Sequence, residues 1–378
     1  TPTPTMTPTP TATPTPTPTP TATPPPTPTP TPAGLPLEAA LARVAEVLPG
    51  LRGLAIQQEV QPTLLGRSAL QERLRRDLDE PRSVEALAKE EALLRVLGLL
   101  GPQANLRDIY LSVYTEQVLG FFDTETEELV VVAEVPLLGL SDETTLAHEV
   151  THALQQQHFD IHARLEALHD QRDAHLAYSA LLEGDASLTS VLYALEVFGE
   201  ERLNEAFPTA ADSSAFEAAP EAVQALVVFP YSAGLEFVAS LYRGTRTFEE
   251  VDRAFRQPPL TTAEVLEPQR YLEGVIPVEV ALPDLAASLG ERWELLDQQP
   301  LGQLLLAVLL EHRVATSTAF ATAGGWAGDQ YALYRRDDGA LLLALRLAWE
   351  SPAAADRFYD TYLGGLGADA AWRYFSSL

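Results

Sequence analysis

The sequence predicts a mainly α-helical protein of the α+β class, with a small sheet before its central helix and a small α/β unit at its C-terminal end. Three observations favour this class. Much of residues 33–323 carries apolar residues at helical spacing, two short apolar runs flank a polar turn at residues 123–128, and two more flank residues 337–339. Because cysteine is absent, a large apolar core must stabilise the fold.

The N-terminal residues 1–32 are Thr-Pro repeats with a few alanines and no charge. Proline at nearly every second position prevents helix and sheet, so we expect a disordered, polyproline-II-like tether, about 100 Å long when fully extended. Such tracts are typical of surface stalks. Because the chain opens at Thr1 without an initiator methionine, we also expect an export signal upstream. The protein would then be extracytoplasmic, secreted or anchored to the cell surface, and tethered to the membrane rather than spanning it.

The first helices and strands follow this tract. Three amphipathic helices are predicted at Leu37–Val47, Leu64–Asp79 and Ser83–Leu99. The residues of Ile109–Thr115 alternate as in a strand, and Val118–Phe122 and Leu129–Ala133 predict a β-hairpin or small meander.

The segment His148-Glu149-Val150-Thr151-His152 has the form H-E-x-x-H. On a helix, two histidines four residues apart project from one face and can both bind zinc, while the glutamate between them can accept a proton from zinc-bound water. Ser141 is the expected N-cap of this helix. On a helical wheel the apolar stripe lies away from both histidines, which predicts that they are not core residues. The alternative is a pair of helix histidines without a ligand.

A third ligand decides the class of zinc site. His158 lies ten residues after His148, which is the spacing of the metzincin pattern H-E-x-x-H-x-x-G-x-x-H. In that pattern a glycine turns the chain back to the metal, but here Gln155 takes its place. A continuing helix would carry His158 about 15 Å along its axis. Since the only methionine is Met6, a metzincin Met-turn is also impossible.

Glu183 is the better candidate. It interrupts the apolar pattern of a predicted helix from Ala174 to Leu188. A carboxylate among apolar residues is costly to bury unless it is paired or binds a metal. A second helix packed against the first would bring Glu183 to the open side of the histidines and complete a His₂Glu zinc set. The alternative is an exposed charge at a helix end. Asp185 is the natural hydrogen-bond partner of a ligating histidine, although a continuous helix turns it to another face.

These motifs resemble the gluzincin-type HExxH zinc metallopeptidases of bacterial cell-surface proteins. The resemblance rests on HEVTHALQQQHFD and on ALLEGDA about thirty residues later. It extends to EQVLGFFD at 116–123, FPYSAG at 229–234, AFRQPP at 254–259 and GWAGDQY at 325–331. It implies a zincin-like metallopeptidase domain over residues 33–323, zinc at His148, His152 and Glu183, and Glu149 as general base. The aspartate that follows the glutamate by four residues in better-known gluzincins is missing.

The rest of the chain is predicted to be mainly helical up to residue 323. The helices are Ala186–Phe198, Glu221–Tyr242, Thr247–Phe255 and Leu301–Ala315. Residues 324–378 predict a small α/β subdomain. Its expected elements are strands at Gln330–Arg336 and Ala340–Trp349, a helix from Ser351-Pro352 to Leu363, and a strand at Trp372–Phe375. No apolar run reaches the ~18–20 residues of a membrane-spanning helix.

The acidic composition of the chain disfavours one class of function, the binding of nucleic acids. The formal net charge is −28 and Lys89 is the only lysine, so no basic stripe could neutralise phosphates, and nucleic-acid binding is disfavoured. We expect zinc-dependent hydrolysis of peptide bonds in a peptide or protein substrate. The alternative is a non-catalytic zinc-binding surface interaction module with the same fold.

Two weaker site hypotheses remain. His158 and His162 form another pair four residues apart, which could hold a second metal, although no glutamate follows His158 in the position of a base. Tyr231, directly after Pro230, could donate a hydrogen bond to a tetrahedral oxyanion. A tyrosine that closes a loop against the core is the favoured interpretation of this residue.

Overall fold

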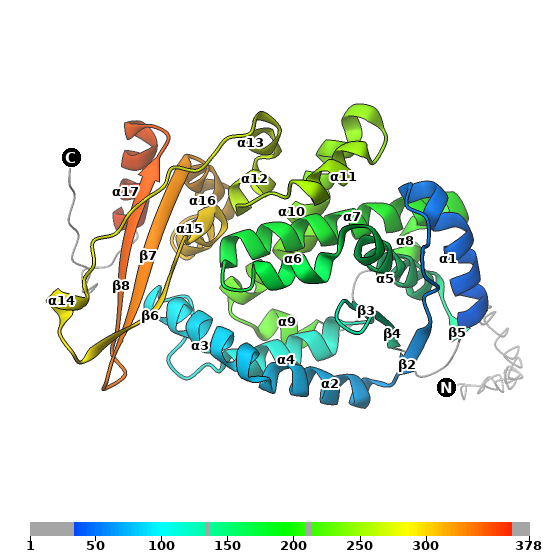
Figure 1. Cartoon of the computed structure of the whole chain (residues 1–378), viewed down its shortest axis with the longest axis horizontal. Coiled ribbons are helices and arrows are strands. Elements are labelled where there is room, and N and C mark those ends of the chain that lie inside the picture. Colours follow the sequence, from blue (N-terminus) through cyan, green and yellow to red (C-terminus); the bar gives the residue numbers. More distant parts are fainter. Residues whose placement is uncertain (1–33, 133–136, 209–212, 365–378) are drawn as a thin grey trace, which may run out of the picture. The chain divides into compact units, whose positions relative to one another are not determined.

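The computed structural model describes residues 34–132, 137–208 and 213–364. The expected tether at residues 1–32 and the expected strand at Trp372–Phe375 lie outside the described residues. Within them, helices predominate and the sheets are small, which confirms the mainly α class with a minor β component (Figure 1).

Four helices begin the chain. They are α1 (Leu37–Arg52), α2 (Arg67–Asp79), α3 (Pro81–Val96) and α4 (Leu106–Gln117). The first three confirm the predicted helices with shifted ends, but α4 replaces the strand expected at Ile109–Thr115, so that prediction was wrong. Asn105 caps α4 by accepting a hydrogen bond from the Asp108 N–H at 3.0 Å, and Leu106, Tyr110 and Val113 are buried at helical spacing.

A three-stranded sheet lies beside the central helices, with the order β2-β4-β3. The expected hairpin is present as β3 (Gly120–Asp123) and β4 (Glu128–Val132). The third strand, β2 (Pro62–Leu65), pairs parallel to β4 and includes residues that the sequence pattern assigned to a helix. As a result β3 is an edge strand. A separate pair joins β1 (Leu35–Pro36) to β5 (Leu137–Leu138).

The helix that carries the H-E-x-x-H motif is α5 (Leu140–Phe159). Its N-cap is Gly139 rather than the expected Ser141, and the Asp142 carboxylate accepts a hydrogen bond from the Gly139 N–H at 2.8 Å. The helix runs without a break to Phe159, as expected from the absence of a glycine. The short helix α6 (Ile161–Ala167) follows it.

The centre of the fold is α7 (Arg172–Phe198), which packs against α5 and against α10 (Glu221–Thr245). The two helices predicted over residues 174–198 are therefore one. Short helices connect or follow these long ones: η1 (Glu200–Arg202), α8 (Leu203–Ala206), α9 (Ser214–Ala218), α11 (Glu249–Arg256), α12 (Thr262–Leu266), α13 (Pro268–Glu273), α14 (Ala286–Leu289), α15 (Gly302–Glu311) and α16 (Thr316–Ala323).

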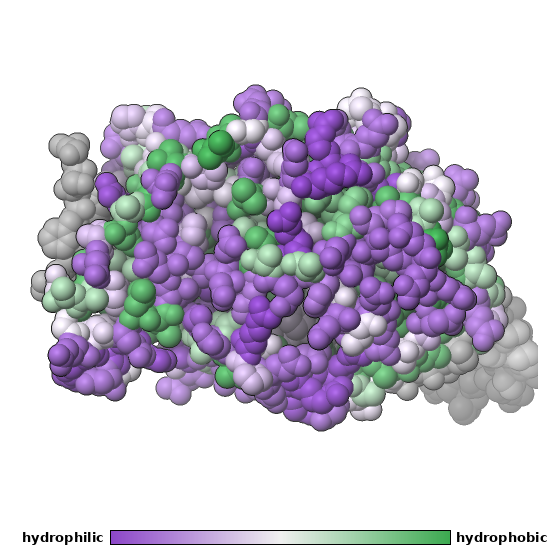
Figure 2. Space-filling view, viewed as in Figure 1, coloured by the Kyte–Doolittle hydropathy of each residue, from purple (hydrophilic) through white to green (hydrophobic). Residues whose placement is uncertain are grey.

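Among the described helices, α10 alone is long and apolar enough to cross a membrane, by length and composition. This differs from the sequence-based expectation that no apolar segment is long enough to span a membrane. In the structure α10 packs on α7, and Phe229, Phe237, Val238 and Leu241 on it are buried. On the face shown in Figure 2, hydrophobic residues are scattered among hydrophilic ones.

The C-terminal sheet is antiparallel, with the order β6-β7-β8. It consists of β6 (Trp293–Gln299), β7 (Trp326–Arg336) and β8 (Leu341–Trp349), and α17 (Pro352–Gly364) follows it. The predicted hairpin at residues 337–339 is present, with Gly339 at φ 85° in its turn. Because β6 pairs with β7, the sheet includes a strand that lies before the boundary expected at residue 324.

Two buried aspartates connect elements in this part of the fold: Asp329 joins the sheet to α15, and Asp173 joins α7 to α12. Asp329 on β7 accepts hydrogen bonds from the backbone of Leu301 and Gly302, at the start of α15, and from the indole of Trp326. Asp173 on α7 accepts from the Thr262 hydroxyl at 2.6 Å. Burial raises the pKa of Asp173 to about 7, and the nearby Asp329 adds to this effect while Thr262 opposes it.

This shift predicts a pH-dependent stability. Between the ordinary pKa of 3.8 and the folded pKa of about 7, the folded protein holds a proton that the unfolded chain has lost. The free energy of unfolding should therefore fall as the pH rises through this range, by up to roughly 4 kcal/mol. Asp173→Asn keeps an acceptor for Thr262 but cannot ionise, so its denaturation midpoint should change less between pH 5 and pH 8. An unchanged pH dependence in this variant would contradict the assignment.

Candidate metal centre

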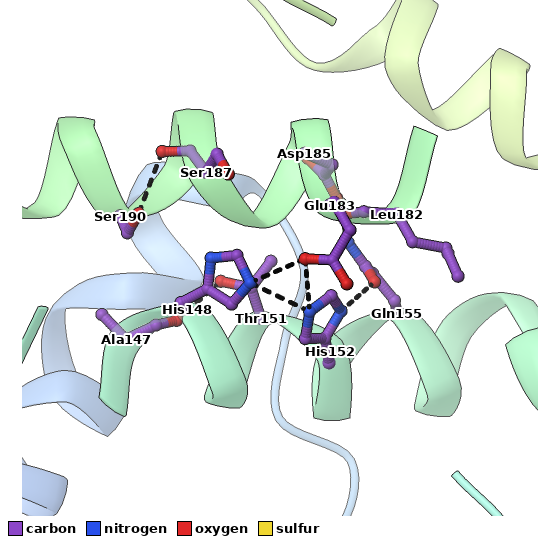
Figure 3. Close-up of polar contacts among 10 residues, drawn as sticks. All are labelled: Ala147, His148, Thr151, His152, Gln155, Leu182, Glu183, Asp185, Ser187 and Ser190. Carbon is purple, nitrogen blue, oxygen red and sulfur yellow. Dashed lines mark hydrogen bonds and ion pairs between the residues drawn. The ribbon is translucent and has the colours of Figure 1, made fainter. Parts of the chain in front are cut away.

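Three side chains from two helices converge on one point (Figure 3). His148 and His152 project from one face of α5, and Glu183 reaches them from α7. His148 Nε2 lies 3.0 Å from Glu183 Oε2, His152 Nε2 lies 3.5 Å from the same oxygen, and the two Nε2 atoms are 3.1 Å apart. The structure thus brings together the three residues that the sequence proposed as ligands.

These separations fit a tetrahedral zinc site. Zinc binds imidazole nitrogen and carboxylate oxygen at about 2.0–2.1 Å, and two ligands at tetrahedral angles are then about 3.3 Å apart. The three observed distances, 3.0, 3.1 and 3.5 Å, scatter around that value. A cation could be coordinated with small adjustments of the side chains and no movement of the helices. Among the described residues, this is the one group of three metal-ligating side chains that is close enough to hold an ion.

The electrostatics of the group also favour a cation. Burial by itself would raise the pKa of Glu183, but the two histidines hold it well below its usual value. Burial lowers the pKa of His152, yet the charge and hydrogen bond of Glu183 outweigh this effect and raise the pKa of His152 to about 9. The pocket therefore stabilises positive charge beside the Glu183 carboxylate.

His152 is buried, contrary to the helical-wheel expectation, because α7 covers this side of α5. It lies in polar surroundings. Its Nδ1 lies 2.8 Å from Gln155 Oε1, and an amide oxygen can only accept, so Nδ1 carries the proton. When the imidazole is in the neutral form that binds a metal, Nε2 carries the lone pair and faces the candidate metal position.

Gln155 is a residue of this site that the sequence analysis missed. It is fully buried, and its amide donates to the Leu182 carbonyl at 3.0 Å and to Asp185 Oδ2 at 2.9 Å. Asp185 in turn accepts from the buried Arg52 guanidinium at 2.7 Å. Asp185 therefore acts on His152 through Gln155 and not directly as suggested. The spacing of three residues between His152 and Gln155 was the available signal, because it places both on one face of the helix.

Glu149 lies between α5 and the edge strand β3, with 7% of its surface exposed. Burial raises its pKa, and the charges of His148 and His152 oppose that shift. Gly120 on β3 is close to it: a Cβ at Gly120 would lie 3.4 Å from Glu149 Cγ and 3.0 Å from the Val130 carbonyl oxygen. The sequence Gly120-Phe121-Phe122-Asp123 therefore allows a close approach of β3 to the carboxylate.

Tyr231 belongs to helix α10, although Pro230 suggested a loop there. Its ring centroid is 6.3 Å from that of His148, and its side chain is 49% exposed rather than packed in the core. The negative charges of Glu183 and Glu149 raise its pKa well above the usual value. The interpretation as a loop-closing core residue was wrong, and the hydroxyl of Tyr231 lies beside the site, close enough to Glu183 for a hydrogen bond.

The position of Glu183 depends on a very close contact between α7 and α10. A Cβ at Gly184 would lie 2.1 Å from the Gly234 carbonyl oxygen, and a Cβ at Gly234 would lie 2.2 Å from the Ala180 carbonyl oxygen. Only glycine fits at either position. The glycines of the LLEGDA and PYSAG segments therefore set the distance between the helices that carry Glu183 and Tyr231.

We expect Gly184→Ala to disturb the site through this contact. The added methyl must push α10 away, which should cost about 1–3 kcal/mol of folding free energy and displace Glu183, thereby weakening zinc binding. Gly244→Ala is the matched control, because Gly244 is in the same pair of helices and a Cβ there meets nothing within 4 Å. Denaturation should show a lower free energy of unfolding, and chelator competition a lower zinc affinity, for Gly184→Ala than for Gly244→Ala. Equal zinc affinity in both would contradict the role of the contact.

His158 and His162 lie away from this centre. His158 Nε2 is 2.7 Å from the Ala55 carbonyl oxygen, which is consistent with the expected failure of the metzincin pattern. His162 Nδ1 lies 3.3 Å from the Thr124 hydroxyl. The pair His158 and His162 does not form part of a three-residue cluster in the described chain, so the structure offers no support for a second metal there.

Comparison with known proteins adds one match. Residues 292–374 match a domain of unknown function (DUF8575). No curated protein and no solved structure matches the chain. The matched segment contains β6, β7, β8 and α17 but not α5 or α7. It therefore agrees with β6 being part of the C-terminal sheet and assigns no activity to the His148, His152 and Glu183 group.

Proposed function

We propose that this protein is a zinc-dependent hydrolase of peptide bonds, with His148, His152 and Glu183 as zinc ligands and Glu149 as general base. The observation that carries the proposal is the convergence of two imidazole nitrogens and one carboxylate oxygen at tetrahedral spacing, beside a buried glutamate. A His₂Glu set leaves a coordination position open, as catalytic zinc sites require.

Bound zinc would supply a Lewis acid, which polarises a carbonyl group and lowers the pKa of water. The chain supplies the proton transfers. The Glu149 carboxylate accepts a proton from the water while the water oxygen attacks the carbonyl carbon. Glu149 then passes this proton to the amine nitrogen as the C–N bond breaks. The raised pKa of Glu149 suits both acceptance and release of a proton.

In this proposal Tyr231 stabilises the charge that forms during the reaction. The tetrahedral intermediate carries negative charge on the former carbonyl oxygen, and a hydrogen-bond donor directed at it lowers the barrier. The Tyr231 hydroxyl is protonated at neutral pH, as a phenol is, and can therefore donate a hydrogen bond. Its ring next to His148 puts this donor on the α10 side of the site.

The edge strand β3 offers a place for an extended substrate. Leu119 accepts a hydrogen bond from the Val132 N–H, and the alternation of an antiparallel pair then turns the backbone groups of Gly120 and Phe122 away from β4. Since no strand of the described residues pairs with the other side of β3, a substrate strand could pair there next to Glu149.

The second candidate function is a zinc-binding interaction module without catalysis. Glu149 favours the enzyme, because burying a carboxylate beside the ligands costs free energy and a structural zinc site has no need of it. The deciding experiment compares the zinc-loaded wild type with the Glu149→Gln variant on a broad peptide library.

A further inference from the structure

The candidate centre opens into a cavity of about 1990 Å³. This is larger than the 300–1,000 Å³ typical of sites for small ligands. Its walls come from α3, α4, α5, α7 and α10, and His148, Glu149 and Glu183 are among the lining residues. A cavity of this size around a hydrolytic centre indicates a substrate much longer than a dipeptide.

The cavity runs along α7. The α7 residues that line it recur every three to four positions from Arg172 to Val191, so they form one stripe on one face of the helix. Nineteen residue steps at about 1.5 Å each give a length of about 28 Å. Glu183 lies inside this length, about 16 Å from Arg172 and about 12 Å from Val191. The metal position is therefore in the interior of the cavity and not at an end.

The two ends of the stripe differ in character. The end near Arg172 is lined by ionisable groups from three elements, among them Lys89, Asp170 and Asp297. The other end is lined by uncharged residues of α5, α7 and the segment after α8, including Ser187, Val191 and Phe207. The cavity lining also includes the carboxylates of Glu116 on α4 and Glu217 on α9. Phe207 is 43% exposed, which leaves an aromatic surface available to an apolar side chain.

Polar side chains without partners lie on the same stripe. His175 and Ser179 line the cavity, and within the described chain neither side chain makes a hydrogen bond. Burial lowers the pKa of His175, so the imidazole is neutral and can donate or accept. An extended peptide carries a backbone donor and an acceptor at every residue that could satisfy such groups.

We infer that the substrate is an extended polypeptide segment of about eight residues that lies along α7 and is cut internally, so that the protein is an endopeptidase. This inference rests on the proposed function. An extended chain advances about 3.3 Å per residue, so about 28 Å holds eight or nine residues. About five of them would lie on the Arg172 side of Glu183 and three or four on the Phe207 side, where an apolar side chain is favoured.

The first test measures binding without turnover. The full chain with Glu149→Gln, loaded with zinc, is titrated with peptides of 4, 6, 8, 10 and 12 residues that are blocked at both ends. Affinity should rise with length up to about eight or nine residues and then stay constant. The wild type should cut the blocked 12-residue peptide at least three residues from either end. Affinity that stops rising at four residues, or cleavage that needs a free terminus, would overturn the endopeptidase inference but leave zinc-dependent hydrolysis intact.

The second test addresses the uncharged end. Phe207→Asp should lower kcat/KM about tenfold or more for peptides with an apolar residue on that side of the cut, and zinc content should not change. Ile276→Asp is the matched control, because Ile276 is 86% exposed and outside the cavity. Equal kcat/KM in both variants would remove Phe207 from the substrate site. A zinc-loaded wild type that neither binds nor cuts any peptide would instead overturn the proposed function.

Discussion

Glu149→Gln should lower the rate of peptide hydrolysis by about two orders of magnitude or more while leaving zinc in place. Glutamine has nearly the shape of glutamate, so the packing against Gly120 is kept, but its amide cannot accept the proton of the attacking water. The three proposed ligands are unaffected. Initial rates on an internally quenched peptide, together with the zinc content of each preparation, measure both effects.

A surface variant controls for the change of charge. Glu196→Gln makes the same substitution at an exposed position on α7 and should retain the wild-type rate. If Glu149→Gln also retained the wild-type rate, the proton acceptor would have to be another group. If its zinc were lost, the variant would report on metal binding instead of proton transfer, and the comparison would have to be repeated at saturating zinc.

Glu183→Ala should have the largest effect on the metal. It removes the only carboxylate of the ligand set and leaves two imidazoles, which cannot by themselves hold zinc tightly. We expect the zinc affinity to fall by at least about a hundredfold, since structural zinc binding of 10 kcal/mol or more is shared among a few ligands. Competition with a chromophoric chelator measures this change.

A substitution at Gln155 distinguishes the loss of a zinc ligand from the loss of a hydrogen bond that orients one. Gln155→Leu removes the hydrogen bond that orients His152 but keeps all three ligands, so the affinity should fall by about tenfold to a hundredfold. A Glu183→Ala variant that binds zinc as well as the wild type would show that another group supplies the third ligand.

The parts of the site that were predictable from sequence depend on local spacing. Two residues four apart on a helix share a face whatever the helix packs against, so His148 and His152 could be paired without a structure. Glu183 was predictable because a carboxylate in an apolar helical pattern needs a partner. The hairpin of β3 and β4 was predictable from its polar turn and its apolar strands.

The parts that were missed depend on contacts between distant segments. Gln155 has a function only because α7 brings Leu182 and Asp185 to it. The pairing of β2 with β4 joins residues far apart in the chain, and nothing near Pro62 signals it. At Ile109–Thr115, apolar and polar residues alternate as in a strand. The segment is nevertheless helical, because α4 buries one side of its surface against the rest of the fold.

The most direct test of the central claim is X-ray absorption at the zinc edge of the zinc-loaded protein, compared with Glu183→Ala. The proposed site predicts one zinc per chain, with two imidazole nitrogens at about 2.0–2.1 Å and a carboxylate oxygen at about 2.0–2.2 Å. In the variant the carboxylate should be absent from the spectrum. A wild-type protein that takes up no zinc, or whose zinc has fewer than two imidazole ligands, would contradict the account.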